Sequence, residues 1–63
     1  MSILNYFEYD HLPARLQRVS MPIGELADQM NTILPDCAEK AAGLRKLLEA
    51  KDCFVRASLE ITD

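Results

Sequence analysis

Apolar residues recur through the first half of the chain at the spacing of an α-helix. The apolar positions follow one another at alternating steps of four and three residues: Leu12, Leu16, Val19, Ile23, Leu26, Met30 and Ile33. Such steps keep the side chains along one side of a helix, where they form a seam that faces a partner helix. The pattern predicts a first helix over about residues 12–34.

The first helix has a possible cap before it, one proline in its first turn and a second proline in its interior. Asp10 can cap the first turn, and Pro13 is tolerated within it. Pro22 comes nine residues further on, where it removes a backbone donor. We therefore expect either a kink near Arg18 or a second helix start capped by Ser20.

The second helix follows a tight turn. Pro35 pushes the residue before it out of the α region and so ends the first helix. Asp36, with Glu39 three residues later, resembles a capping box. We expect a second helix over about residues 37–60, in which Gly43 costs about 1 kcal/mol relative to alanine and lets another backbone come close.

Two lysines interrupt the apolar side of this second helix. At about 100° per residue, one broad side of the helix collects Leu44, Leu47, Leu48, Phe54 and Val55. Lys40 and Lys51 fall inside the same arc. Because a buried, unpaired ammonium is costly, each lysine must reach solvent along its stem, pair with a carboxylate or meet a bound anion.

Charged residues occupy the opposite flank of the second helix. Their spacing lets Arg45 meet Glu49, and lets Asp52 meet Arg56. We expect an ion-pair row on this flank, either in solvent or between subunits.

A chain of 63 residues, 49% of them apolar and 27% charged, is typical of one folded domain. A core of this size rarely supplies more than about 3–5 kcal/mol without a staple or a partner. The predicted fold class is all-α: an antiparallel helical hairpin, residues 1–63, with a short aromatic N-terminal arm, residues 1–11. We expect it to assemble into a compact homo-oligomer, with a hexamer built from dimers as one candidate.

Charge is segregated along the chain. Residues 39–56 hold five of the seven Lys and Arg residues against three acids, which gives +2 there and −5 elsewhere within the net −3. The overall acidity argues against a general DNA-binding protein, whereas the basic segment suits small anionic ligands. Residues 1–12 have no cationic start and no long apolar run, and nowhere do about 18 apolar residues follow one another. We therefore expect no export, no membrane partner and a cytoplasmic location.

The cysteines and the histidine suggest no metal or catalytic site. Cys37 and Cys53 are sixteen residues apart on one predicted helix, or about 24 Å, so they cannot form a disulfide within the chain. They also lack the spacing of a zinc site. His11 is the single histidine and lies beside a cap, so we expect a surface role. We predict no catalytic residue, metal or cofactor.

A resemblance to a known family covers nearly the whole chain. The segment EKAAGLRKLLEAKDCFVRA, with an aromatic FEY before it and a first helix ending in LP, resembles the helical-hairpin family shared by phage anti-CBASS and Thoeris anti-defence nucleotide sponges. The residues that match the family pattern are Glu39, Lys40, Leu44, Lys46, Leu47, Glu49, Ala50, Phe54 and Ala57. Ala38 stands where the family usually has arginine, and Phe54 where tryptophan is common.

The resemblance implies a protein without enzymatic activity, which binds cyclic di- or trinucleotides in the host cytoplasm and withholds them from immune effectors. Such a ligand needs stacking faces and cations. Stacking candidates are Tyr6, Phe7 and Tyr9, and cation candidates are Lys40, Arg45, Lys51 and Arg56. The rings could instead cover the apolar end of the hairpin, and the arginines could form ion pairs. The alternative function is a small helical adaptor or inhibitor that grips a host protein through its apolar face.

Overall fold

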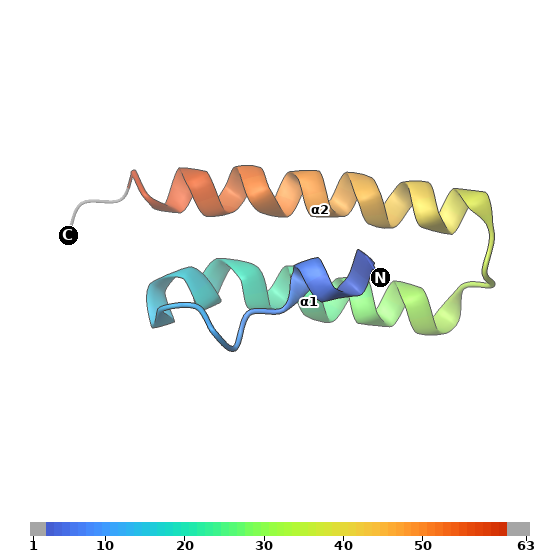
Figure 1. Cartoon of the computed structure of the whole chain (residues 1–63), viewed down its shortest axis with the longest axis horizontal. Helices are drawn as coiled ribbons and strands as arrows, with labels where there is room; N and C mark the ends of the chain where they lie inside the picture. The colour runs from blue at the N-terminus through green and yellow to red at the C-terminus, as the bar shows by residue number, and fades with distance from the viewer. Residues whose placement is uncertain (1–2, 61–63) are drawn as a thin grey trace.

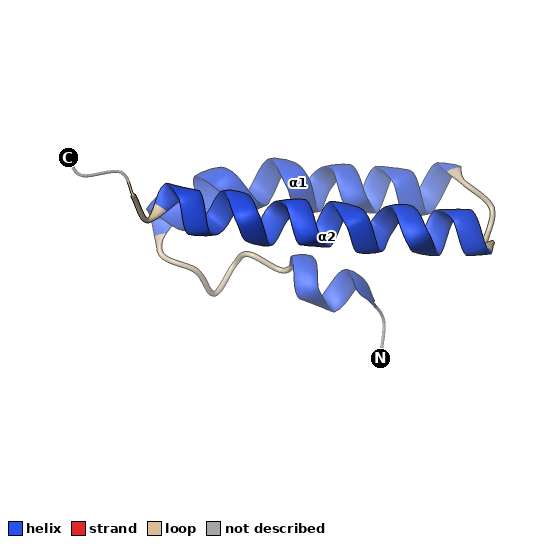
Figure 2. Ribbon diagram, turned by 90° about the horizontal axis from the view of Figure 1, so that it is seen from above, coloured by secondary structure: helices blue, strands red, loops and turns tan. Residues whose placement is uncertain are grey.

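Three helical elements make up the computed structural model, which describes residues 3–60. A short 3₁₀ helix, η1 (Ile3–Phe7), precedes two long helices, α1 (Ala14–Ile33) and α2 (Ala38–Ser58). The long helices run antiparallel (Figure 1), and η1 lies along one side of the pair (Figure 2). The predicted all-α hairpin with an N-terminal arm is therefore confirmed for the described residues. Within them, no helix has both the length and the apolar character to cross a membrane.

The start of α1 differs from the prediction. Asp10 does not cap the helix, because Pro13 is the N-cap residue and no side chain caps it. The preceding turn is held instead by Gln17, whose Nε2 donates to the carbonyl oxygens of Leu12 at 2.7 Å and Asp10 at 3.3 Å. A side chain within α1 therefore holds this turn, in place of a capping side chain that precedes the helix.

The middle of α1 contains Pro22 within a single helix from Ala14 to Ile33. Pro22 has no N–H to donate to the carbonyl of Arg18. The alternative of a second start capped by Ser20 is wrong, because Ser20 lies inside the helix and is buried.

Cys37 caps α2, not Asp36. The Cys37 Sγ accepts a hydrogen bond from the backbone N–H of Lys40 at 3.4 Å. The predicted capping box of Asp36 and Glu39 is therefore wrong, and Asp36 pairs with the Lys40 ammonium. The sulfur takes the place that a serine or aspartate oxygen usually occupies at a helix start.

Each helical element contributes one residue to the buried apolar core: Phe7, Ala27 and Leu44. Phe7 is only 4% exposed. Partly buried apolar residues surround this core: Ile3, Leu4, Ile23, Leu47 and Leu48. The expectation that the aromatic arm packs on the hairpin is confirmed at Phe7.

Small residues on α1 make room for the arm. The buried residues of α1 are Ser20, Gly24 and Ala27, spaced four and three apart. A Cβ at Gly24 would lie 2.9 Å from the Phe7 carbonyl oxygen and 3.2 Å from the Tyr9 ring. The arm therefore reaches its position because residue 24 has no side chain.

The apolar seam of α1 is only partly covered. Leu26 is 42% exposed and Ile33 67% exposed, so the predicted seam is not buried against the partner helix at these two residues. Gly24 lies against the arm and Ala27 packs in the core with Phe7, while the outer edge of the seam is in solvent. Phe54 of α2 is also exposed, although it shares the predicted apolar side.

We predict opposite effects from adding one methyl group at the two glycines. Gly24→Ala should lower the free energy of unfolding by about 1–3 kcal/mol, because the arm must shift. Gly43→Ala is the matched control, since its Cβ would meet no atom within 4 Å, and in dilute solution it should stabilise the helix by up to about 1 kcal/mol. Urea unfolding followed by circular dichroism measures both. Equal effects would show that the arm does not rest on Gly24.

Candidate functional site

Two hollows of different chemistry lie on different sides of α1. One is the arm pocket, of about 310 Å³, between the arm and α1. The other is the turn groove, of about 560 Å³, between α1 and α2 next to the turn. The sequence predicted neither as a distinct hollow.

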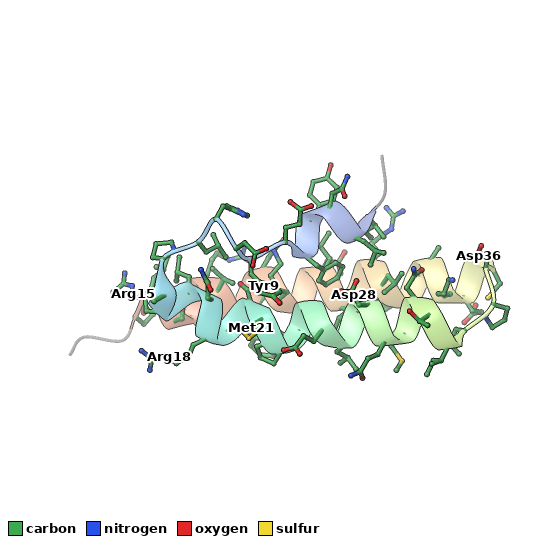
Figure 3. All side chains as sticks on the ribbon, turned by 90° about the horizontal axis from the view of Figure 1, so that it is seen from below. Tyr9, Arg15, Arg18, Met21, Asp28 and Asp36 are labelled. Atoms are coloured by element: carbon green, nitrogen blue, oxygen red, sulfur yellow. The ribbon has the colours of Figure 1, made fainter. Side chains whose placement is uncertain are left out.

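The arm pocket is acidic. Glu8, Asp10 and Asp28 line it, beside Tyr9 and Gly24. Figure 3 shows Tyr9 and Asp28 on the side of α1 that faces the arm. No lysine or arginine of the described chain lines this pocket. A phosphate placed there would meet three carboxylates, so the pocket does not suit an anionic ligand. Within the described residues, no group of His, Cys, Asp or Glu is arranged to hold a metal ion.

The three aromatic candidates have different exposures. Phe7 belongs to the core, and its ring is unavailable to a ligand in the single chain. Tyr9 is half-buried, and its ring lies next to Gly24. Tyr6 is 54% exposed and presents most of its side chain to solvent. Tyr6 is therefore the ring best placed for stacking.

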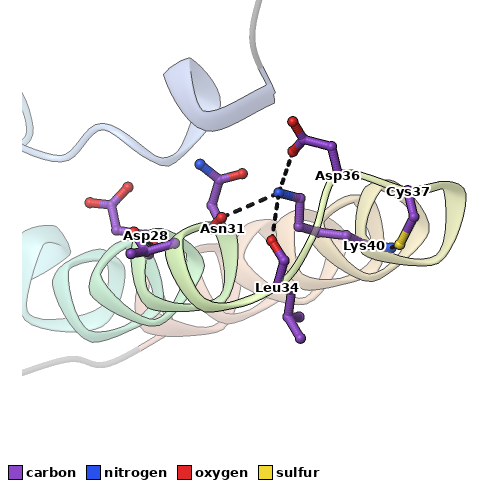
Figure 4. Close-up of polar contacts among 7 residues, drawn as sticks. Asp28, Asn31, Leu34, Asp36, Cys37 and Lys40 are labelled. Atoms are coloured by element: carbon purple, nitrogen blue, oxygen red, sulfur yellow. Dashed lines mark hydrogen bonds and ion pairs between the residues drawn. The ribbon is translucent and has the colours of Figure 1, made fainter.

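Lys40 joins the two helices across the turn (Figure 4). Its ammonium donates to the carbonyl oxygens of Asn31 and Leu34, each at 3.2 Å, and forms an ion pair with Asp36. These carbonyls belong to the last turn of α1 and its cap, where helices leave acceptors without partners. The Lys40 side chain is 8% exposed. Of the three outcomes foreseen for this lysine, the structure shows pairing with a carboxylate.

Asp36 is perturbed by the same contact. The hydrogen bond from Lys40, and then its positive charge, lower the pKa of the Asp36 carboxyl below the ordinary value of 3.8. The Asp36 side chain itself is fully exposed. The pair thus links an exposed acid to an ammonium that is nearly buried.

Lys51 also pairs with a carboxylate. Its Nζ lies 2.9 Å from Asp52 Oδ1. The ion pairs of residues 3–60 are this one and Lys40–Asp36, so the row expected from Arg45 to Arg56 does not form within the single chain, and its formation between subunits stays a prediction. Asp52 turns toward the lysine at the packed edge of α2, and Arg56 Nη2 instead donates to Cys53 Sγ at 3.3 Å.

Helical spacing places Arg45 on the flank of α2 next to Leu48, about 60° around the helix from it. Arg45 follows Leu44 and precedes Leu48 by three residues, and both leucines pack in the core around Phe7. Arg56 is eleven residues further along, three turns and about 16 Å away on the same flank of α2. Both arginines are exposed. We call the surface formed by Tyr6, Arg45 and Arg56 the arm face.

The structure therefore divides the seven predicted residues. The arm face holds three of them, Tyr6, Arg45 and Arg56. The remaining four are occupied or partly covered within the chain: Phe7, Tyr9, Lys40 and Lys51. Neither the arm pocket nor the turn groove brings together an exposed ring and the cations. Both cysteines are free and exposed.

Sequence reasoning missed Gly24 and the capping role of Cys37. Small residues at positions 20, 24 and 27 signal one side of α1 that another backbone can approach. Comparisons with protein-family models, curated proteins and solved structures gave no match to this chain.

We predict that the Lys40–Asp36 pair makes stability pH-dependent in acid. Because the folded-state pKa of Asp36 is lowered, the pair stabilises the fold above about pH 4. This stabilisation is lost as the pH falls through the lowered pKa. Asp36→Asn should therefore lose less stability than the parent chain between about pH 5 and pH 2. Urea unfolding at several pH values measures the difference.

Lys40→Met is the control for this prediction, because it keeps the apolar stem and removes the ammonium. It should show the same reduced acid sensitivity, together with a loss of about 1–3 kcal/mol at neutral pH from the carbonyls left without a donor. Identical pH profiles for all three proteins would contradict the role assigned to the pair.

Proposed function

We propose that this protein binds and sequesters cyclic di- or trinucleotides without cleaving them, as an assembly of several copies in the cytoplasm of an infected host. The observations that carry the proposal are the exposed ring of Tyr6, which precedes the core residue Phe7, and the exposed Arg45 on the flank of α2 beside Leu48, which packs against the same core. The resemblance of α2 to anti-defence nucleotide sponges supports it. The result would be that host immune effectors never receive the signal.

The arm face has the chemistry that such ligands require. Stacking of a base on an aromatic ring is worth about 1–3 kcal/mol by alanine substitution. A guanidinium recognises phosphate through two parallel hydrogen bonds, and Arg45 enters no ion pair among residues 3–60. Tyr6 and Arg45 thus supply one stacking surface and one anion contact.

More than one copy is part of the proposal. In the single chain, Arg56 lies about 16 Å from Arg45 along α2, and the arm pocket is acidic. A ring-shaped ligand with two or three phosphates needs cations on several sides. A second chain can supply them by placing its own arginines opposite Tyr6. Binding would then be tight without any bond being broken.

The turn groove favours a second candidate function. An apolar groove between two helices is the surface into which amphipathic helices dock. The chain could therefore act as an adaptor or inhibitor that holds a helix of a host protein at Leu26, Met30 and Leu47. The melting point separates the two: a sponge is stabilised by cyclic nucleotide, whereas an adaptor is stabilised by its protein partner.

We predict binding to at least one member of a panel of cyclic di- and trinucleotides, measured by isothermal titration calorimetry. Tyr6→Ala should weaken binding by about 1–3 kcal/mol, and Tyr6→Phe should retain most of it because the ring remains. Arg45→Gln should weaken binding and reduce its dependence on salt. Nucleotide recovered after long incubation should be chemically intact.

Arg18→Gln is the matched control for Arg45→Gln. Arg18 is also an exposed arginine, but it lies near the start of α1, at the end of the hairpin away from Asp36 (Figure 3). Its replacement should leave the affinity unchanged. Absence of binding across the whole panel would remove the proposed function. Equal losses from Arg18→Gln and Arg45→Gln would show that the arginines act through net charge alone.

A further inference from the structure

We infer that the turn groove is the contact surface for a second copy of this chain, which docks its own groove against it around a two-fold axis. The inference specifies how copies meet in the proposed assembly, and it applies to the protein without nucleotide. It concerns the side of the hairpin away from the arm face.

The groove is apolar and uncovered. Its walls include Leu26 and Met30 of α1, Leu34 at the C-cap of α1, and Gly43, Leu44 and Leu47 of α2. Leu26 and Leu34 remain 42% and 43% exposed. The arm packs against the small residues of α1, on another side of that helix, so nothing in the described chain closes the groove.

The single chain has little buried core to stabilise it. Only three apolar residues of the described chain are buried. The chain exposes 4751 Å², whereas a compact monomer of 7.1 kDa exposes about 4,100 Å². The excess is about 650 Å², which is less than the roughly 800 Å² that each partner buries in a standard interface. One additional apolar contact would therefore bring the surface to that of a compact protein.

The spacing of the seam favours an identical partner. Val19, Ile23, Leu26, Met30 and Ile33 of α1 keep the alternating steps of three and four that are typical of helices packing on helices. In a two-fold dimer, the same patch serves both copies, so a surface with both a groove and projecting leucines can complement itself. The outer edge of the seam, at Leu26 and Ile33, is the part that α2 of the same chain leaves exposed.

Gly43 marks the point of closest approach. A Cβ there would meet no atom within 4 Å, so no contact inside the chain requires a glycine at this helical position. Glycine nevertheless costs about 1 kcal/mol there. Gly43 lines the groove, where its missing side chain lets a second α2 cross closely.

Charges on both sides of Gly43 fit an antiparallel crossing. Glu39 is four residues before the glycine and Lys46 is three residues after it. At about 100° per residue, all three lie within about 60° of one another around α2. Two α2 helices that cross antiparallel at Gly43 therefore place Glu39 of each copy opposite Lys46 of the other. Both residues are exposed in the single chain.

The first test is sedimentation velocity without nucleotide, over a range of concentrations. The parent chain should form a dimer or a larger assembly, and Leu26→Lys should shift it to the monomer. Met21→Lys is the matched control, because Met21 is on the same helix, is 39% exposed and does not line the groove. Circular dichroism should show all three proteins folded. A parent chain that stays monomeric at every concentration would overturn the inference.

A charge exchange tests the crossing at Gly43. Glu39→Lys and Lys46→Glu should each weaken association at low salt by about three- to tenfold. The double variant should restore it, because each new lysine again faces a glutamate. Rescue of this kind requires a second copy and would not occur with an unrelated partner. Two single variants that both leave association unchanged, or a double variant weaker than either, would overturn the antiparallel crossing.

The two thiols report where along α2 the second copy lies. Cys37 lines the groove, whereas Cys53 lies ten residues, or about 15 Å, beyond Gly43 along α2. Both are exposed in the single chain. Alkylation of Cys37 should slow as the concentration rises, and that of Cys53 should not. An assembly that protects Cys53 alone would overturn the assigned contact surface.

An assembly that forms through the turn groove and binds no nucleotide would remove the proposed function and leave this inference standing.

Discussion

The arm backbone lies against α1 at Gly24, where a Cβ would come within 2.9 Å of the Phe7 carbonyl oxygen. This close approach places Phe7 between the two long helices, and Phe7 is the largest residue of a core that otherwise consists of Ala27 and Leu44. The small side of α1 is turned toward the arm as a result. The larger residues of the seam are then displaced to one edge, and the turn groove opens there.

Lys40 holds the other end of the hairpin by electrostatics rather than by packing. Its stem lies among apolar residues, while its ammonium satisfies carbonyls of α1 and the carboxylate of Asp36. A lysine that is 8% exposed with three acceptors incurs little of the cost of a buried unpaired charge. Its position in the apolar arc is thus explained without a bound anion. An anion at this site would have to compete with Asp36 for the same ammonium.

The sequence was sufficient to predict the class of the fold, the two helices and the turn, because apolar periodicity and Pro35 are local signals. It did not predict the cap at Cys37, since a thiol is an uncommon cap, nor the exposure of Leu26. The exposure of Leu26 depends on the side of α1 against which the arm packs. Contacts between residues far apart in the sequence determine that side. Candidate site residues were chosen by chemical type, and the fold separates Tyr6 and Arg45 from Phe7 and Lys40.

The arm face and the turn groove lie on different sides of the hairpin, and this arrangement constrains any assembly. Two copies that meet through their grooves would leave Tyr6 and Arg45 of both facing outward. A pair alone would therefore not enclose a nucleotide, and a ligand pocket would need a second kind of contact, between the arm faces of different pairs. The acidic arm pocket and the guanidinium groups of Arg45 and Arg56 offer opposite charges for that contact. Sequestration would then depend on apolar pairing first and charge complementarity second.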